Sequence, residues 1–174
     1  MTPKTLVRLA NLGRPRRPAG ARVRRAEPVL SDPATATRQL AELISRPVTD
    51  ADLPALRRVQ QLAVQTAEAL LTGEPPDCAA INAAARGSTA HVELAATDGA
   101  LCRQLVWRDA SITAGLARSL VEELAALEPT RLRRCARAEC GLLFYDATRS
   151  RTRRWHAEDP CGWRERQHHR RSRS

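Results

Sequence analysis

Three cysteines and one histidine near the C-terminus have the residue types and the spacing of a metal site. Four residues separate Cys135 from Cys140, four separate His156 from Cys161, and fifteen lie between the two pairs. Two such pairs, joined by a segment long enough for a hairpin, are typical of a closed tetrahedral zinc site. We therefore expect one structural Zn²⁺ per chain, bound by Cys135, Cys140, His156 and Cys161.

The imidazole ligand has alternatives. His168 and His169 follow Cys161 by seven and eight residues, and a water molecule or an open fourth position is the remaining choice. We favour His156, because residues two turns further along the same predicted helix point away from its first turn. A competing interpretation is three isolated thiols in a loose Arg-rich tail, but exposed free thiols there would be prone to oxidation.

Short elements must position these ligands. Residues 141–145 and 152–155 are expected to pair as strands around a turn at 146–150, and Pro160 and Cys161 to start a short helix. A segment of about 40 residues with few large apolar side chains cannot fold on burial alone. Metal binding is therefore expected to supply much of its stability.

The charge of the chain is concentrated at its two ends. The 174 residues carry a net charge of +10. Residues 1–30 hold eight basic side chains against one acidic, residues 131–174 hold thirteen against five, and residues 31–130 hold eight against thirteen. This layout predicts that the ends meet a polyanion while the middle is an ordinary acidic domain.

Arginine dominates the basic residues, since Lys4 is the only lysine. Arginine is suited to bidentate contacts with phosphate. Codon bias in a GC-rich genome would also increase the number of arginines, but it would not concentrate them at the two ends of the chain. The main candidates for nucleic-acid binding lie in the C-terminal segment. They are Arg149, Arg151, Arg153, Arg154, Arg164, Arg166, Arg170, Arg171 and Arg173. Arg14, Arg16 and Arg17 are candidates for a second, less specific contact.

The middle of the chain predicts an α+β domain that is mainly helical. Apolar spacing and capping residues indicate helices over 33–45, 49–73, 75–87 and 111–127, and a β-hairpin turns at 97–99. We divide the chain into a basic, partly flexible N-terminal arm (1–30), this domain (31–128) and a small treble-clef-like zinc module with an Arg-rich C-terminal helix (129–174). Cys78 and Cys102 are expected in the core, and His91 in a structural position on a half-buried strand.

Several classes of function are disfavoured. A closed four-ligand zinc site leaves no open position for a reacting water. The chain has no glycine-rich phosphate loop and neither a G-x-S-x-G nor an H-E-x-x-H motif, so we expect no enzyme. An odd number of cysteines argues against a disulfide scaffold. No apolar stretch is long enough to span a membrane and the first residues do not resemble a secretory signal, so we expect a cytoplasmic protein.

The C-terminal segment resembles the CGNR zinc-finger family. The resemblance rests on five short motifs: Arg134-Cys135, Glu139-Cys140-Gly141, FYDAT at 144–148, Arg153-Arg154-Trp155 and CGWR at 161–164. The preceding region resembles, more loosely, the ABATE domain that usually precedes this finger, and VRLAN at 7–11 resembles the start of the family. The family usually has cysteine where this chain has His156, a ligand-competent replacement, and asparagine where it has Trp163.

The resemblance implies a stress-related transcriptional regulator whose zinc finger binds DNA. We therefore expect DNA as the partner. The alternatives are a structural zinc module for protein–protein contact or homodimerisation, and a sensor that binds an unknown small-molecule effector through residues 31–128. Trp163 is expected to be a core residue rather than a stacking contact for nucleic acid.

Overall fold

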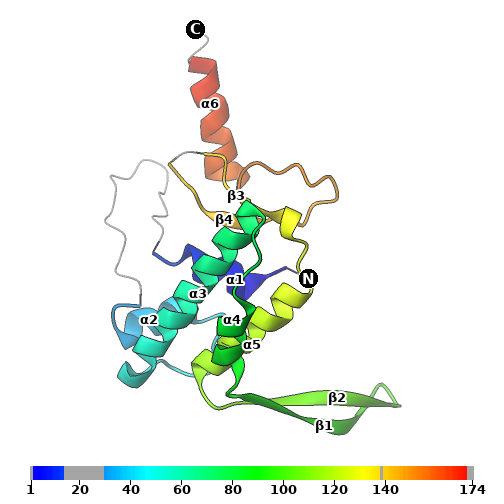
Figure 1. The fold of residues 1–174 in the computed structure, drawn as a ribbon. Helices are drawn as coiled ribbons and strands as arrows, with labels where there is room; N and C mark the ends of the chain where they lie inside the picture. The colour runs from blue at the N-terminus through cyan, green and yellow to red at the C-terminus, as the bar shows by residue number, and fades with distance from the viewer. Residues whose placement is uncertain (1, 14–29, 138, 172–174) are drawn as a thin grey trace.

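The computed structural model describes residues 2–13, 30–137 and 139–171, and in it the helices surround an apolar core with the cysteine-rich segment at one end (Figure 1). The helices in the described part are α1 (Lys4–Asn11), α2 (Pro33–Leu40), α3 (Leu53–Thr72), α4 (Cys78–Ala85), α5 (Ile112–Ala125) and α6 (Trp163–Arg171). The strands pair into two antiparallel sheets, β1 (Ser88–Thr97) with β2 (Ala100–Asp109) and β3 (Leu132–Arg134) with β4 (Leu143–Tyr145). This confirms the predicted α+β class.

The longest helix is the one that the sequence marks most clearly. A 3₁₀ turn (Asp50–Asp52) leads into α3, and the side chains of Thr49 and Asp52 form a capping box around it. Arg46 donates two hydrogen bonds of 3.0 Å to the Asp52 carboxylate. At the other end Gly73 adopts φ 82°, the left-handed conformation that ends a helix at little cost for glycine.

The other predicted helices are present but shorter. Asp32 caps α2 by accepting from the Thr35 N–H at 2.8 Å, yet the helix ends at Leu40 instead of Ser45. Ser111 caps α5 in the same way. The Ala-rich helix α4 begins only at Cys78, after the two prolines of the predicted helix start. The end of α2 differs from the prediction because the apolar residues 43 and 44 pack on the core from a turn rather than from a further helical turn.

The beginning of the partly flexible arm assigned to residues 1–30 is a helix packed on the body. Residues 4–11 form α1, whose Leu6 and Leu9 are buried in the core. The Glu123 carboxylate of α5 accepts the backbone N–H groups of Thr5 and Leu6 at 2.7 and 2.9 Å, satisfying two donors that a helix start leaves open. The arginines at 14, 16 and 17 lie outside the described residues.

The β1–β2 hairpin is not half-buried, as the sequence suggested, but projects from the body as an exposed arm (Figure 1). His91 is consequently exposed, and its Nε2 lies 2.5 Å from the Glu93 carboxylate. Cys102 is exposed on the same arm, and Cys78 is exposed at the start of α4. The prediction that both cysteines are core residues was therefore wrong. Cys102 is exposed because the arm packs on the body only at its root, and Cys78 is exposed because α4 turns Ile81 into the core.

The apolar core continues across residue 129. Leu132 of β3 and Leu143 of β4 belong to the same buried cluster as the residues of α1, α3 and α5. The division at 129 therefore separates two parts of the chain that share packing. Among the described residues, no helix combines the length and the apolarity needed to cross a membrane.

Candidate metal centre

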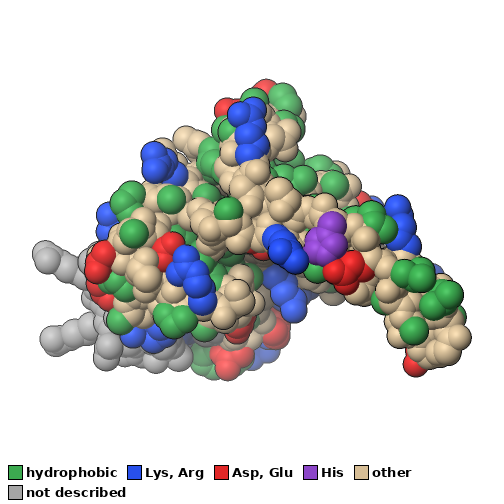
Figure 2. All heavy atoms as spheres, turned by 90° about the horizontal axis from the view of Figure 1, so that it is seen from below, with side chains coloured by type: hydrophobic (Ala, Val, Ile, Leu, Met, Phe, Trp, Pro, Cys, Tyr) green, Lys and Arg blue, Asp and Glu red, His purple; other side chains and the backbone are tan. Residues whose placement is uncertain are grey.

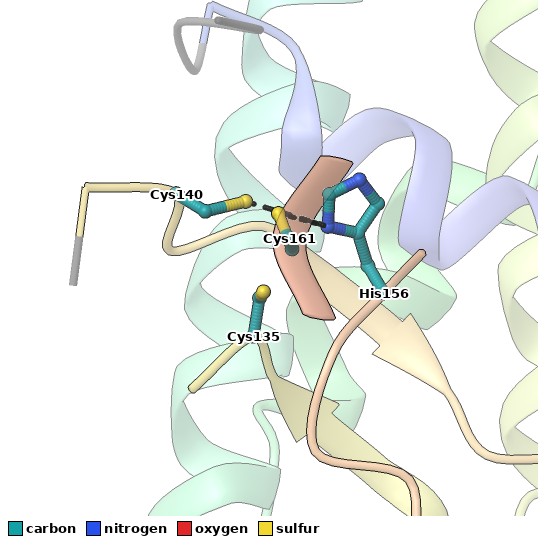
Figure 3. A group of neighbouring side chains, drawn as sticks. All are labelled: Cys135, Cys140, His156 and Cys161. Carbon is teal, nitrogen blue, oxygen red and sulfur yellow. Dashed lines mark hydrogen bonds between the residues drawn. The ribbon is translucent and has the colours of Figure 1, made fainter. Parts of the chain in front are cut away.

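The four predicted ligands lie together (Figure 3), in the segment at the end of the molecule that carries α6 (Figure 1). Cys135 follows β3, Cys140 precedes β4, His156 lies in the long loop after β4, and Cys161 lies in the kinked turn (Glu158–Gly162) that leads into α6. Their ligand atoms all lie within 4.8 Å of one another. Cys135 and Cys161 are buried, and the other two are half-buried.

The distances suit a tetrahedral metal. His156 Nδ1 lies 3.4 Å from Cys140 Sγ and 3.6 Å from Cys161 Sγ. In a tetrahedral site with Zn–S near 2.3 Å and Zn–N near 2.0 Å, sulfur and nitrogen ligands are separated by about 3.5 Å. Three thiols and an imidazole are also the soft and borderline donors that zinc prefers. The cluster therefore fits one structural zinc, which would neutralise the thiolates and tie four separate segments together.

The protein surroundings oppose ionisation of the Cys140 and Cys161 thiols. Burial, with a smaller contribution from the neighbouring thiols Cys140 and Cys135, raises the pKa of the Cys161 thiol to about 12. Burial likewise raises the pKa of Cys140, although the backbone N–H of Leu142 partly offsets the shift. Several thiolates cannot share this pocket without a cation, so a bound divalent metal would reverse the balance by stabilising the deprotonated forms.

The backbone around the first ligand pair forms a tight loop. Cys135 N–H donates to the Leu142 carbonyl at 2.8 Å, and Cys140 N–H donates to the Arg137 carbonyl at 3.0 Å. Gly141 then takes φ 59° and turns the chain into β4. The Ala136 N–H donates to the Arg154 carbonyl at 2.8 Å, which fastens the loop of the second ligand pair to that of the first.

The predicted strand pairing inside the zinc segment was wrong. The strand at 143–145 pairs with Leu132–Arg134, in the register Leu132 to Tyr145 and Arg134 to Leu143, and not with residues 152–155. Residues 152–155 are irregular. The reason is that Leu132 and Leu143 are both drawn into the shared core, whereas the side chains at 152–154 are exposed and polar.

Asp146 organises the loop that carries His156. Its side chain is fully buried and accepts from the hydroxyl and the backbone N–H of Thr148 and from the backbone N–H of Arg153, at 2.5, 3.0 and 2.9 Å. The hydrogen bond from the Thr148 hydroxyl is the main cause that lowers the pKa of Asp146, and the two backbone N–H groups add to it. The carboxylate thus holds both ends of the segment 148–153 in place.

Several arginines of this region serve the loop itself. Arg131 donates to the carbonyls of Asp146 and Thr148, both at 2.9 Å. Arg133 donates to the Arg151 carbonyl at 2.6 Å, and Arg153 donates to the His156 carbonyl at 2.7 Å while its guanidinium lies over the Phe144 ring. Among the predicted nucleic-acid contacts, Arg153 therefore has an evident structural task next to a ligand.

The remaining candidate arginines lie on the surface of the finger or on α6, except Arg173, which lies outside the described residues. Arg149, Arg151, Arg154, Arg166, Arg170 and Arg171 are exposed, and Arg164 is half-buried. Arg151 lies 3.2 Å from the Glu128 carboxylate, and Arg166 forms an ion pair with Glu158. His168 lies on α6 and is not among the four residues of the cluster, and the side chain of His169 lies outside the described part of the structure.

Trp163 is not the core residue that the sequence suggested. It is 52% exposed at the first position of α6, two residues after Cys161. The aromatic residue before the histidine ligand, Trp155, is the more enclosed of the two, and its buried Nε1 has no hydrogen-bond partner among the described atoms.

Two residues with structural tasks at this site were not recognised from their chemistry. Asn11 hydrogen-bonds the backbone of Leu143, and Asp146 holds the His156 loop. Both lie within motifs that resemble the family, VRLAN and FYDAT. The Asp-x-Thr spacing at 146–148 is a recognisable local turn signal, because an Asp carboxylate readily accepts from the backbone two residues on. Nothing local marks Asn11, whose partner is 132 residues away.

The comparisons agree with this geometry. None of the curated proteins that were compared matches the chain. Residues 131–174 match the family model of the CGNR zinc finger. That range contains all four residues of the Cys/His cluster and the whole of α6. The C-terminal segment of this chain is therefore similar to the CGNR zinc finger, and the Cys/His cluster within it fits one structural zinc.

Proposed function

We propose that this protein is a zinc-dependent DNA-binding regulator of transcription, in which the C-terminal finger contacts the DNA. The observation that carries the proposal is the position of α6. The helix starts next to Cys161 and extends away from the body, so that its sides are open to a partner (Figure 1). Its sequence WRERQHHRR contains four arginines and one glutamate. A bound zinc would hold the start of this basic helix rigidly.

Charge supports a phosphate-binding surface. Arg170 and Arg171 are exposed in the last turn of α6, and Arg149 and Arg154 are exposed on the loop below it. Arginine side chains on a small rigid scaffold provide the sequence-independent part of DNA affinity by displacing counterions. The central domain, with thirteen acidic against eight basic residues, would be repelled by DNA and leaves this end as the binding surface.

Trp163 adds an aromatic contact to that surface. It is half-exposed at the start of α6, and three and seven residues later Arg166 and Arg170 recur at the spacing of one helical face. An exposed indole beside arginines can stack on a base or enter a groove. We therefore assign Trp163 to the DNA-binding surface instead of the core.

A gel-shift titration tests the proposal. The zinc-loaded full chain is titrated against DNA from upstream of its own gene at several salt concentrations. Each phosphate contact contributes about 0.9 to the slope of log affinity against log salt. Arg170→Ala together with Arg171→Ala should weaken binding and flatten the slope by about one to two units.

The matched control removes the same charge elsewhere. Arg38 and Arg58 are exposed on α2 and in the first half of α3, at the end of the body away from α6 (Figure 1). Arg38→Ala together with Arg58→Ala should leave the slope unchanged. Absence of binding at low salt, or equal effects of both double variants, would contradict the proposal and favour a protein–protein module.

A second candidate function has its own structural support. An apolar pocket of about 370 Å³ lies between α3, α4 and α5, and its lining includes Leu70, Cys78, Ile81, Asn82, Val121 and Leu124. Its volume is within the range of small-molecule sites. An effector bound there would make the protein a one-component sensor, a role compatible with DNA binding. Thermal stabilisation by small apolar compounds, lost in Ile81→Gln but retained in Glu42→Gln, tests this role.

A further inference from the structure

The β1–β2 arm separates its side chains into an apolar and a polar face. In an antiparallel pair, residues directly opposite one another lie on the same face, and successive residues alternate. The register therefore places four cross-strand pairs together on one face: Ala90 with Trp107, Val92 with Leu105, Leu94 with Arg103, and Ala96 with Leu101. The opposite face holds His91, Glu93, Gln104 and Arg108.

The apolar face is exposed. Leu94 and Leu101 are 72% and 74% exposed, and Val92 and Leu105 are also more than half-exposed. Figure 2 shows the arm extending away from the body. A two-stranded hairpin alone is only marginally stable in water, and a long exposed apolar strand pair is a site of association. We therefore expect another protein surface to cover this apolar face.

The root of the arm is held firmly. The Ala110 N–H donates to the Gly87 carbonyl at 2.9 Å, which extends the ladder to the base of the hairpin. Arg118 of α5 donates to the Asp109 carboxylate at 3.2 Å and lies over the Trp107 ring at 4.9 Å. The ion pair and the ring contact fix the direction in which the arm leaves the body, so its apolar face is presented in a defined orientation.

We propose that the apolar face of the β1–β2 arm packs against the same face of a second copy of this chain. The inference does not rest on DNA binding. In a two-fold interface the same surface patch of both copies is in contact. Like charges on that patch must therefore not face one another. The apolar face carries Arg103 as its one charged residue beyond the root, and an antiparallel arrangement turns the two arginines toward opposite ends of the interface.

The size of the face also suits a second copy. Ten residues per strand span about 33 Å, and two strands about 4.8 Å apart form a ribbon roughly 10 Å wide. The two faces of a dimer together have a projected area of about 700 Å². Because side chains protrude from each face, the accessible surface that the dimer buries is larger and approaches the ~1,000 Å² of a small specific interface. The expected dimer is therefore weak, with a Kd in the micromolar range.

Sedimentation velocity tests the proposal with the zinc-loaded full chain. The wild type should shift from monomer to dimer between about 1 and 200 μM, a range that brackets a micromolar Kd. Leu94→Glu together with Leu101→Glu should keep the protein monomeric throughout. Both side chains are exposed in the monomer, so zinc content and the far-ultraviolet circular dichroism should stay at the wild-type values.

The matched control places the same two charges on the polar face. Thr89 and Gln104 point to the side opposite Leu94, and Thr89→Glu together with Gln104→Glu should dimerise as the wild type does. If the charge changes on the apolar face disturb folding, Leu94→Ser together with Leu101→Ser provides a milder variant with the same expected loss. A wild type that stays monomeric, or a dimer equally sensitive or insensitive to both faces, overturns the proposal.

Discussion

The side-chain amide of Asn11 pairs with both backbone groups of Leu143. Its Nδ2 donates to the Leu143 carbonyl at 2.8 Å, and its Oδ1 accepts from the Leu143 N–H at 2.8 Å. Asn11 is the last residue of α1, and Leu143 is the first residue of β4. The amide thereby satisfies the edge of β4 as a neighbouring strand would, and it joins the start of the chain to the zinc finger.

Asn11→Ala should lower the free energy of unfolding by about 1 to 3 kcal/mol, because it leaves two backbone groups of Leu143 without partners. Urea unfolding measures the change. Asn82→Ala, at an exposed position of α4, is the control and should be close to neutral. An equal effect of the two substitutions would show that the pair with Leu143 contributes nothing specific.

Zinc content should follow the four ligands. The purified wild type should contain one zinc per chain, Cys140→Ser should contain much less, and Cys102→Ser on the exposed arm should match the wild type. His156→Cys should retain zinc, since thiolate also binds it, whereas His156→Ala should release it more easily to a chelator. Wild-type zinc retention in His156→Ala together with its loss in His168→Ala would identify a different imidazole ligand.

Metal removal should disorder the finger unevenly. Chelation is expected to expose the amides of residues 136–141 and 154–162 to hydrogen exchange, because zinc holds those loops. The amides of β3 and β4 should remain protected, since Leu132 and Leu143 are anchored in the apolar core. Simultaneous loss of protection in β3, β4 and the loops would show that the metal controls the whole segment from residue 131.

Asp146 should contribute stability that depends on pH. The pKa of its carboxyl is lowered in the folded protein, chiefly by the Thr148 hydroxyl. Stability from the ionised form is therefore present above the ordinary pKa near 4 and declines as the pH falls below that value toward the folded pKa. Asp146→Asn should unfold more easily than the wild type at pH 7, and the difference should shrink at pH 3. A difference independent of pH would contradict this assignment.

Glu158 should restrain DNA binding. Its carboxylate forms an ion pair with Arg166 on α6. The same carboxylate packs against Gly162, at the position that the Cβ of any other residue would occupy. Glu158→Gln removes the competing charge and should strengthen binding and steepen the salt slope by about 0.9, the contribution of one phosphate contact. Glu42→Gln, an exposed acid next to α2, should change neither quantity.

What the sequence determined by itself was local. The spacing of Cys135, Cys140, His156 and Cys161 pointed to the metal cluster, because ligands on short loops are held by the metal and not by distant packing. The capping residues and apolar periodicity marked α5 within two residues at each end and α3 within one residue at its end, while the predicted start of α3 fell on the 3₁₀ turn before it. These signals act within a few turns of helix. The basic character of α6 could likewise be predicted, because it depends only on the residues of that one segment.

Only the tertiary structure decided the relationships between distant segments. It placed α1 in the core, paired β4 with β3 instead of with residues 152–155, and left the β1–β2 arm and Trp163 exposed. An amphipathic pattern predicts that one face of an element is apolar, but it does not predict which other segment covers that face. Burial depends on contacts between residues far apart in the chain. The pairing of Asn11 with Leu143 across the whole fold is the clearest case.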